Sequence, residues 1–474
     1  MGSVNLIGGG LDVGTIVDQL MQIERQPETI MQNQITQNNN KVTAFQTLNT
    51  KLSSLLDKLN SFIYNGGDSN SLLMPSSFQD RLQQSLFSAR NAVSSDDSTV
   101  SVSSTQGTAG GTYGITVSQL ALAKTMASAN FADATTTSAG TGTLVIQTGS
   151  ADPVTVTIDS SNNTLTGIRN AINSANAGVT ATIINDGSAS PYRLIVASNE
   201  TGTSNAFTLT NNLTGGTSLA LTQTQAAVDA NFTVNSISIT KSSNTVSDVI
   251  DGVTLNLKAL TSTPVSVTVT NDIDSIVSAF KDLASAYNDL NSFFNAQFTY
   301  NSTTKTAGLL SGDFTVRDVQ SRVQQLLTQG ITNGLSSYGV ISQLGLTFGR
   351  DGALTVDETK LRNLLSTDMK GVAGLMLGSG DSADGEKSIL ISLQAALKGI
   401  TDPLSGPIHS ATDSLNKSTA SIQDEISKFE ERMTVVQEQL TEQYSQADQA
   451  LKLLSLNQAA LSNQLASLTK IGSS

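Results

Sequence analysis

The residues that could do acid–base or nucleophilic chemistry are few. The chain has one histidine, His409, and no cysteine, so any Ser-His-Asp arrangement would have to use His409, and thiolate chemistry is absent. His409 stands in the segment GPIHS, just ahead of a long helical pattern. That position favours a capping or solvent-facing role for the imidazole.

The densest group of possible cation ligands is the segment GSGDSADGE (378–386), with Asp381, Asp384 and Glu386 close together. Its spacing is not that of a calcium loop, so we expect an exposed acidic loop and no metal site. The chain also has no Walker loop, no Trp and only 4% aromatic residues to line a sugar cleft. Paired carboxylates far apart in sequence stay open as an alternative. We predict no enzyme, no catalytic residue and no cofactor.

The charge balance excludes two kinds of partner. The 26 Lys and Arg residues face 39 Asp and Glu residues, a formal charge of −13. Such a field repels phosphate backbones and anionic lipid surfaces, so we expect no nucleic-acid and no membrane partner. The first basic residue is Arg25, and Asp12 and Asp18 interrupt the apolar stretch before it. We therefore expect no cleavable signal peptide here, so that the protein is either cytoplasmic or exported by a route that does not read such a signal.

Helical patterns occupy both ends of the chain. The C-terminal pattern predicts one helix over 410–468, about 90 Å long at about 1.5 Å per residue. Its apolar residues alternate spacings of four and three, which is the seam of a helix that packs lengthwise against another helix. The predicted C-terminal seam comprises Leu415, Ile422, Ile426, Phe429, Met433, Val436, Leu440, Leu454 and Leu461.

The N-terminal pattern has two parts, because the Asn-rich run QNQITQNNN interrupts the apolar spacing. The first part has Ile16, Leu20, Ile23, Pro27 and Ile30 at helical spacing. The second part, which we expect to be the first partner of the C-terminal seam, comprises Phe45, Leu48, Leu52, Leu55 and Leu59. This pairing would leave 16–30 and 447–468 for other proteins.

Between the ends, Val, Ile and Thr alternate with polar residues in short segments, which is typical of antiparallel strands. One helix is expected at 164–172, two more at 314–328 and 357–366, and a hairpin at 344–357. The fold class is therefore multidomain α+β, with coiled-coil-like terminal helices forming a stalk and antiparallel β-rich domains inserted between them.

Four domains are expected from this order of elements. Residues 1–45 and 430–474 form a flexible terminal helical region. Residues 46–88 and 272–429 form a helical leg with the small hairpin. Residues 89–125 with 231–271 form an inner β domain, and 126–230 form an outer one.

Several segments carry a resemblance to a known family. Residues 11–27 (LDVGTIVDQLMQIERQP), 244–257 and 344–357 resemble the bacterial flagellar filament cap protein (hook-associated protein 2) family. Residues 164–198 are similar to the repeat shared by hook-associated proteins and flagellins. These matches are spread in order over nearly the whole chain.

The resemblance implies a structural protein that is secreted through the flagellum and located at its distal tip. It implies a homo-oligomeric ring that prevents leakage of exported flagellin and promotes flagellin folding and insertion. Its implied partners are other copies of the chain, flagellin and an export chaperone. Two alternatives stay open: another axial protein, such as one of the hook–filament junction, and a surface adhesin that binds host glycans.

Overall fold

The computed structural model describes residues 11–64, 77–303, 305–332, 334–378 and 388–471. The chain divides into two compact units, one of residues 1–61 with 279–474 and one of residues 62–278. The predicted acidic loop lies almost entirely outside the described residues. The first unit is helical, and the second is built mainly from β-strands.

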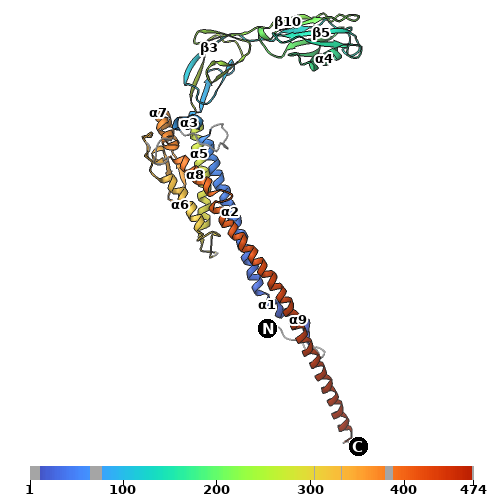
Figure 1. Cartoon of the computed structure of the whole chain (residues 1–474), viewed down its shortest axis with the longest axis vertical. Helices are drawn as coiled ribbons and strands as arrows, with labels where there is room; N and C mark the ends of the chain where they lie inside the picture. The colour runs from blue at the N-terminus through green and yellow to red at the C-terminus, as the bar shows by residue number, and fades with distance from the viewer. Residues whose placement is uncertain (1–10, 65–76, 304, 333, 379–387, 472–474) are drawn as a thin grey trace. The chain divides into compact units, whose positions relative to one another are not determined.

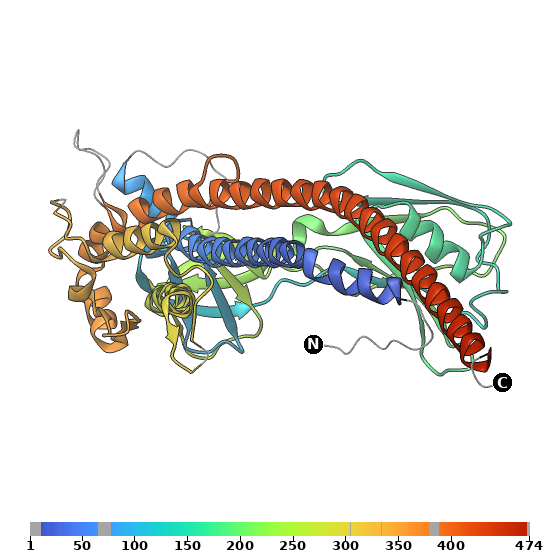
Figure 2. The ribbon, with the colours of Figure 1, turned by 90° about the horizontal axis from the view of Figure 1, so that it is seen from below.

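The helical unit contains a small bundle and a long pair of helices (Figures 1 and 2). The predicted helix 314–328 is confirmed as α6, and the predicted C-terminal helix is confirmed as α9. The predicted hairpin is confirmed as the pair β18–β19. The elements are α1 (Val13–Glu24), α2 (Gln26–Ile63), α5 (Ile273–Phe298), β16 (Tyr300–Asn301), β17 (Thr306–Ala307), α6 (Phe314–Thr328), β18 (Leu346–Phe348), β19 (Leu354–Val356), α7 (Glu358–Leu377), α8 (Ile389–Ile400) and α9 (Pro407–Ile471).

Side-chain caps fix where several of these helices begin. The carboxylates of Asp12, Asp313 and Asp357 accept hydrogen bonds from backbone N–H groups three residues further on, at 3.2, 3.3 and 3.0 Å. Each bond satisfies one of the donors that a helix leaves unpaired at its start. The starts of α1, α6 and α7 are thus set by local sequence.

The Asn-rich run that interrupts the apolar spacing does not break the helix, because α2 continues without interruption from Gln26 to Ile63. Asn38, in the middle of the run, is buried, and its Nδ2 donates to Oγ of Ser418 on α9 at 3.3 Å. Asn costs a helix only about 0.7 kcal/mol or less per residue, so packing against α9 outweighs the local preference.

One half of the β unit is a pair of antiparallel sheets. A five-stranded sheet has the order β1-β15-β3-β11-β12, and a three-stranded sheet has the order β13-β14-β2. Alternate side chains of these strands, among them Val100, Ile115, Phe232, Leu255 and Val267, form one buried cluster. The strands are β1 (Arg90–Ser94), β2 (Val100–Ser104), β3 (Gly111–Gln119), β11 (Ala230–Val234), β12 (Ile237–Lys241), β13 (Thr245–Ile250), β14 (Val253–Leu257) and β15 (Val265–Asn271).

The other half of the β unit has a separate core. Sheets of order β10-β4-β8-β7 and β6-β5-β9 pack with helix α4 around a cluster that includes Phe131, Ile146, Ile168, Val196 and Phe207. The predicted helix at 164–172 is confirmed as α4. These elements are β4 (Thr125–Ala127), β5 (Gly142–Thr148), β6 (Val154–Ile158), α4 (Leu165–Ser174), β7 (Val179–Asn185), β8 (Tyr192–Ser198), β9 (Phe207–Asn211) and β10 (Thr222–Gln225).

The alternating segment 232–240 is not one continuous strand but lies in the hairpin β11–β12. Asn235 and Ser236 form its turn with φ values of 48° and 68°, the left-handed conformation that a two-residue hairpin loop requires. The polar pair Asn-Ser is a weaker turn signal than Asn-Gly, so the alternation concealed it. The boundaries predicted for the inner and outer β domains stay a prediction.

Candidate assembly site along the terminal helices

The N-terminal part of the predicted seam lies in the core of the helical unit. Phe45, Leu48, Leu52, Leu55 and Leu59 are each no more than 1% exposed. This half of α2 also contacts other helices of the bundle through polar side chains. Asn60 accepts a hydrogen bond of 2.6 Å from Gln394 on α8, and Lys58 pairs with Asp282 on α5 at 2.8 Å.

The C-terminal seam packs against a different stretch of the chain from the one expected. Three contacts set the register of α9 against the N-terminal helices. The backbone N–H of Leu11 donates to Asp448 at 2.7 Å, Arg25 pairs with Glu430 at 2.8 Å, and Asn38 donates to Ser418. The helices are therefore antiparallel, and residues 422–440 lie opposite about 13–34. The prediction that Phe45 to Leu59 are the first partner of the C-terminal seam is therefore wrong.

The apolar core of this helix pair is formed by Val17 and Met21 from α1 with Phe429 and Met433 from α9. All four side chains are buried. Val436 and Leu440 are partly buried and pack against the same cluster. Nearer the start of α9, Ile422 is buried, whereas Leu415 and Ile426 are half-buried. The sequence-based seam missed Val17 and Met21, although their spacing of four is itself a helical signal.

The five residues in the first part of the predicted N-terminal pattern lie on another face of the helix. Ile23 is 61% exposed and Ile30 is 67% exposed. We call Ile16, Leu20, Ile23, Pro27 and Ile30 the outer stripe. The N-terminal helices thus have two apolar stripes on neighbouring faces. The stripe with Val17 and Met21 forms the buried contact with α9, whereas the outer stripe is half-buried at Ile16 and Leu20 and exposed at Ile23, Pro27 and Ile30. Periodicity identified the outer stripe as apolar, but it could not tell which of the two stripes forms the buried contact with α9.

The distal part of α9 is exposed along its length. Every residue from Gln449 to Leu465 is exposed, and Leu454 and Leu461 of the predicted seam are 65% and 59% exposed. We call Leu451, Leu454 and Leu461 the distal stripe. It begins just beyond Asp448, the residue that Leu11 contacts. Figures 1 and 2 show α9 continuing past α1.

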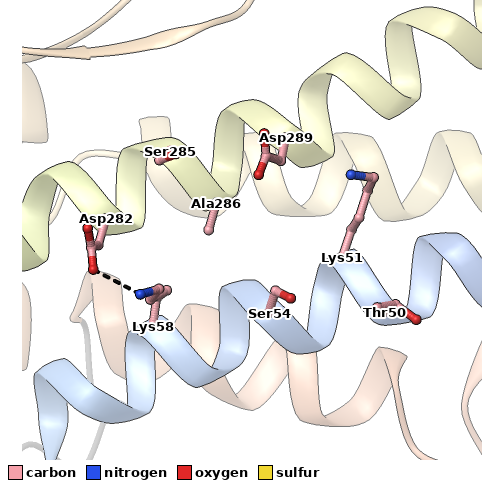
Figure 3. Close-up of a pocket in the computed structure, with 8 residues that line it drawn as sticks. All are labelled: Thr50, Lys51, Ser54, Lys58, Asp282, Ser285, Ala286 and Asp289. Carbon is pink, nitrogen blue, oxygen red and sulfur yellow. Dashed lines mark hydrogen bonds and ion pairs between the residues drawn. The ribbon is translucent and has the colours of Figure 1, made fainter.

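A shallow polar groove of about 410 Å³ runs between α2 and α5 (Figure 3). Its lining residues are Thr50, Lys51, Ser54, Lys58, Asp282, Ser285, Ala286 and Asp289. The Lys58–Asp282 ion pair bridges the two helices at one end. Lysines from one helix facing aspartates from the other are typical of a solvated helix–helix boundary, and this set includes no histidine or aromatic residue.

His409 lies exposed in the first turn of α9. Asp402 and Asp413 are close enough for its charge to contribute to lowering the pKa of both carboxyl groups, but each has stronger contacts of its own. Asp402 accepts hydrogen bonds from Leu404 and Ser405, and Asp413 pairs with Lys417 at 2.7 Å. Across the described residues, no group of three or more His, Asp and Glu side chains is placed to hold a metal ion.

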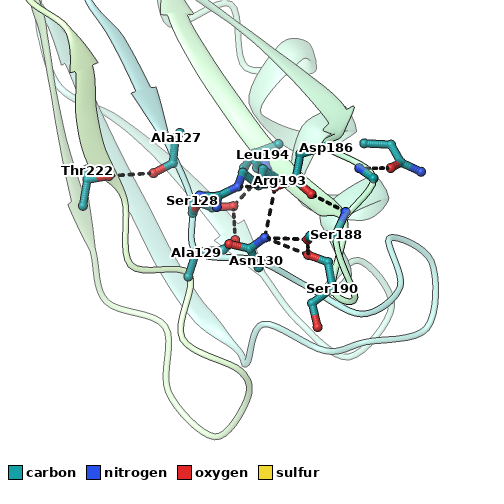
Figure 4. A network of polar contacts seen from close by, with 12 residues as sticks. Ala127, Ser128, Ala129, Asn130, Asp186, Ser188, Ser190, Arg193, Leu194 and Thr222 are labelled. Carbon is teal, nitrogen blue, oxygen red and sulfur yellow. Dashed lines mark hydrogen bonds and ion pairs between the residues drawn. The ribbon is translucent and has the colours of Figure 1, made fainter.

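A polar network in the β unit orders the loop after β7 (Figure 4). The amide of Asn130 donates to Asp186 at 3.2 Å and to the carbonyl of Ser190 at 2.8 Å, while Arg193 donates to Asp186 at 3.0 Å. Hydrogen bonds from Ser188, and then from Arg193, hold the pKa of Asp186 well below its usual range. Because these groups satisfy one another, the network is structural.

A pair of helices from the two chain ends, β-sheets inserted between those ends in the sequence, and an exposed helical extension are the features of a structural protein. Comparison with known proteins gives its family. Residues 9–124 match the family model for the flagellar hook-associated protein 2 N-terminus, and residues 227–455 match the model for its C-terminus. The chain belongs to the flagellar hook-associated protein 2 family. Residues 143–200 also match the flagellin hook IN motif.

Individual relatives match over almost the whole chain. The flagellar hook-associated protein 2 of Escherichia coli K12 is 31% identical, over 90% of this chain and 92% of the relative. The B-type protein of Pseudomonas aeruginosa PAO1 is 30% identical, over 99% of this chain and 98% of the relative. A crystal structure of the D1-D2-D3 domains of the E. coli flagellar cap protein FliD has a TM-score of 0.61, with 32% identity, and covers 79% of this chain and 99% of that one.

The expected family and the expected α+β fold are thus confirmed. The repeat inferred at 164–198 lies within the matched flagellin hook IN motif. Among the described helices, none combines the length and apolar character needed to cross a membrane.

Proposed function

We propose that this chain caps the distal tip of the bacterial flagellar filament. Several copies form a ring there, keep exported flagellin from leaking away, and promote its folding and insertion into the growing filament. The protein acts by binding, without catalysis or cofactor. The solved relative of the same family is described as a flagellar cap protein, which supports this role.

One observation carries the proposal: α9 extends as a fully exposed helix from Gln449 to Leu465. Each leucine in it would contribute about 1.5–3 kcal/mol on full burial, an upper estimate because the unfolded chain already buries some surface. In an isolated chain such a stripe favours aggregation, so it fits a protein that works within an assembly. Flagellin subunits and neighbouring copies are the partners of this surface.

The β unit suits the part of the cap that stays folded while the ends exchange partners. Each pair of sheets has its own buried cluster, and the contacts within each cluster come from residues of the β unit alone. A segment with its own core keeps its shape when neighbouring elements move. The packing of the helical ends depends on fewer buried side chains, so their local opening needs less free energy.

A deletion strain tests this function. Without the chain, cells should still make and export flagellin, and the culture medium should contain monomeric flagellin in excess while filaments are missing. Restoring the gene should restore filaments and lower the flagellin in the medium. Normal filaments in the deletion strain would contradict the proposal.

The location of the protein separates the two alternatives from the cap. Labelled protein should be found at filament tips only, whereas label at the hook–filament boundary would favour a junction protein. Host-glycan binding by the purified chain, together with normal filaments in the deletion strain, would favour an adhesin.

A further inference from the structure

The two uncovered stripes of the terminal helices are complementary in form. The distal stripe continues the spacing by which Phe429, Met433, Val436 and Leu440 pack against α1, since the seam runs on through Ala447 to Leu451, Leu454 and Leu461. It is therefore the continuation of an established helix–helix interface beyond the point where the partner helix ends. An interface of the same kind needs a second apolar helix face.

The outer stripe offers such a face. Its residues run from Ile16 to Ile30 at spacings of four and three, the pattern that meets another helix lengthwise. Ile16 to Ile30 and Ala447 to Leu461 each contain 15 residues, and the first and last lie about 21 Å apart along a helix. In the same chain the two stripes cannot meet, because Leu11 already lies beside Asp448, at the beginning of the distal segment.

Charge distinguishes between possible pairings of the stripes. Residues 11–30 carry four carboxylates (Asp12, Asp18, Glu24, Glu28) and one guanidinium (Arg25), a net charge of −3. Residues 447–465 carry one carboxylate, that of Asp448, and one ammonium, that of Lys452, which pair at 2.7 Å and leave no net charge. Two outer stripes brought together would combine −3 with −3, whereas an outer and a distal stripe combine −3 with zero and avoid this repulsion.

From this geometry we infer that the distal stripe of one copy packs against the outer stripe of the next copy. The contact is heterologous, since it joins two different surfaces, and such contacts generate a closed ring when the rotation between copies closes. This inference rests on the proposed homo-oligomeric cap and names the surfaces through which the copies of the terminal helices meet.

Two variants of the full chain test the contact. The tail variant carries Leu454→Asp and Leu461→Asp, and the head variant carries Ile23→Asp and Ile30→Asp. All four side chains are more than half exposed, so neither variant should lose helicity or thermal stability. Leu404→Asp is the matched control, because Leu404 is 85% exposed but lies outside both stripes.

Sedimentation velocity provides the measurement. The wild type and the control should self-associate, and the tail and head variants should each do so at least about a hundredfold more weakly. An equimolar mixture of tail and head variants should give a one-to-one dimer, because one intact stripe of each kind remains in that pair. A mixture that stays monomeric, or a head or tail variant that associates like the wild type, would overturn the inference.

A different outcome is expected if flagellin, and not a second copy of the chain, binds the two stripes. In that case both variants would lose binding to depolymerised flagellin while their self-association stayed unchanged, and the inference would be wrong. The cap function has its own readout. A chain that is monomeric at all concentrations but restores filaments in a deletion strain would overturn the head-to-tail contact and leave the cap intact.

Discussion

Arg25 and Glu430 lie 405 residues apart in the sequence, but Nη1 of Arg25 lies 2.8 Å from Oε1 of Glu430 in the structure. Their ion pair connects the junction of α1 and α2 to the middle of α9. Both side chains are nearly 40% exposed, so water and salt screen the interaction. The apolar contacts of the α1–α9 pair must therefore provide most of its stability.

This relationship predicts a small effect for Glu430→Gln. The change should lower the free energy of opening of α1 by no more than about 1 kcal/mol, because exposed ion pairs contribute about that much or less. Hydrogen exchange of the amides in 13–24 measures the opening. A much larger loss of protection would mean that the ion pair, and not the apolar seam, joins the two ends.

Met433→Asp should have the opposite outcome. Met433 is only 4% exposed and packs with Val17 and Met21, so the change removes an apolar contact and buries a carboxylate. We expect about 3 kcal/mol or more of lost stability in the pair, with α1 detached from α9 and the β unit unchanged. Val435→Asp is the control, because Val435 on the same helix is 51% exposed and should tolerate the change. Equal hydrogen exchange in 13–24 for both variants would contradict this packing.

The β unit should fold when residues 89–272 are expressed alone. Its two buried clusters lie wholly within this range, and the N–H of Asp272 donates to the carbonyl of Ala89 at 3.0 Å, which joins the two ends of the fragment. Circular dichroism should show strands that unfold cooperatively on heating. A fragment that stays disordered would count against the division into an inserted β region and helical ends.

Stability of the β unit in acid should depend on Asp133. Hydrogen bonds from the side chain and backbone of Thr135 and from the backbone of Thr136 lower the pKa of Asp133 to about 2. Because the folded pKa lies below the unfolded one, the stabilisation is present above the unfolded pKa and is lost as the pH falls towards about 2. The difference in melting temperature between wild type and Asp133→Asn should stay constant above about pH 5 and shrink between about pH 4 and 2. A constant difference throughout would show that the carboxylate is not linked to folding.

Two glycines in left-handed conformations make a matched pair for a test of packing. Gly202 has φ +94°, and a Cβ there would lie 2.4 Å from Cβ of Ser242, whereas Gly187 has φ +75° and open space around it. Gly187→Ala should cost about 1 kcal/mol from backbone strain alone, and Gly202→Ala should cost at least about 2 kcal/mol more because of the clash. Denaturant unfolding measures both values. An equal loss of unfolding free energy in both variants would mean that the backbone around Gly202 shifts to accommodate the added Cβ.

Sequence alone predicted local elements well and their partners less well. The helices at 164–172 and 314–328 are determined by side chains a few residues apart, so short-range patterns locate them. The partner of Met433 depends instead on the antiparallel register of α9, which is set by contacts such as Leu11–Asp448 between residues hundreds of positions apart. Periodicity identifies a helix face as apolar but does not say what covers it. Both the outer and the distal stripe have the spacing of a seam, yet Ile23, Ile30, Leu454 and Leu461 are exposed.

The central claim is that the helical ends are the working parts of a filament cap. Its most direct test is filament length in a deletion strain that produces the chain ending at Asp448. This deletion removes a segment whose described side chains, from Gln449 to Leu465, are all exposed, so the remaining protein should stay folded with its β unit intact. We predict that the shortened chain is exported yet fails to restore filaments, whereas the full chain restores them. Filaments of normal length with the shortened chain would contradict the account.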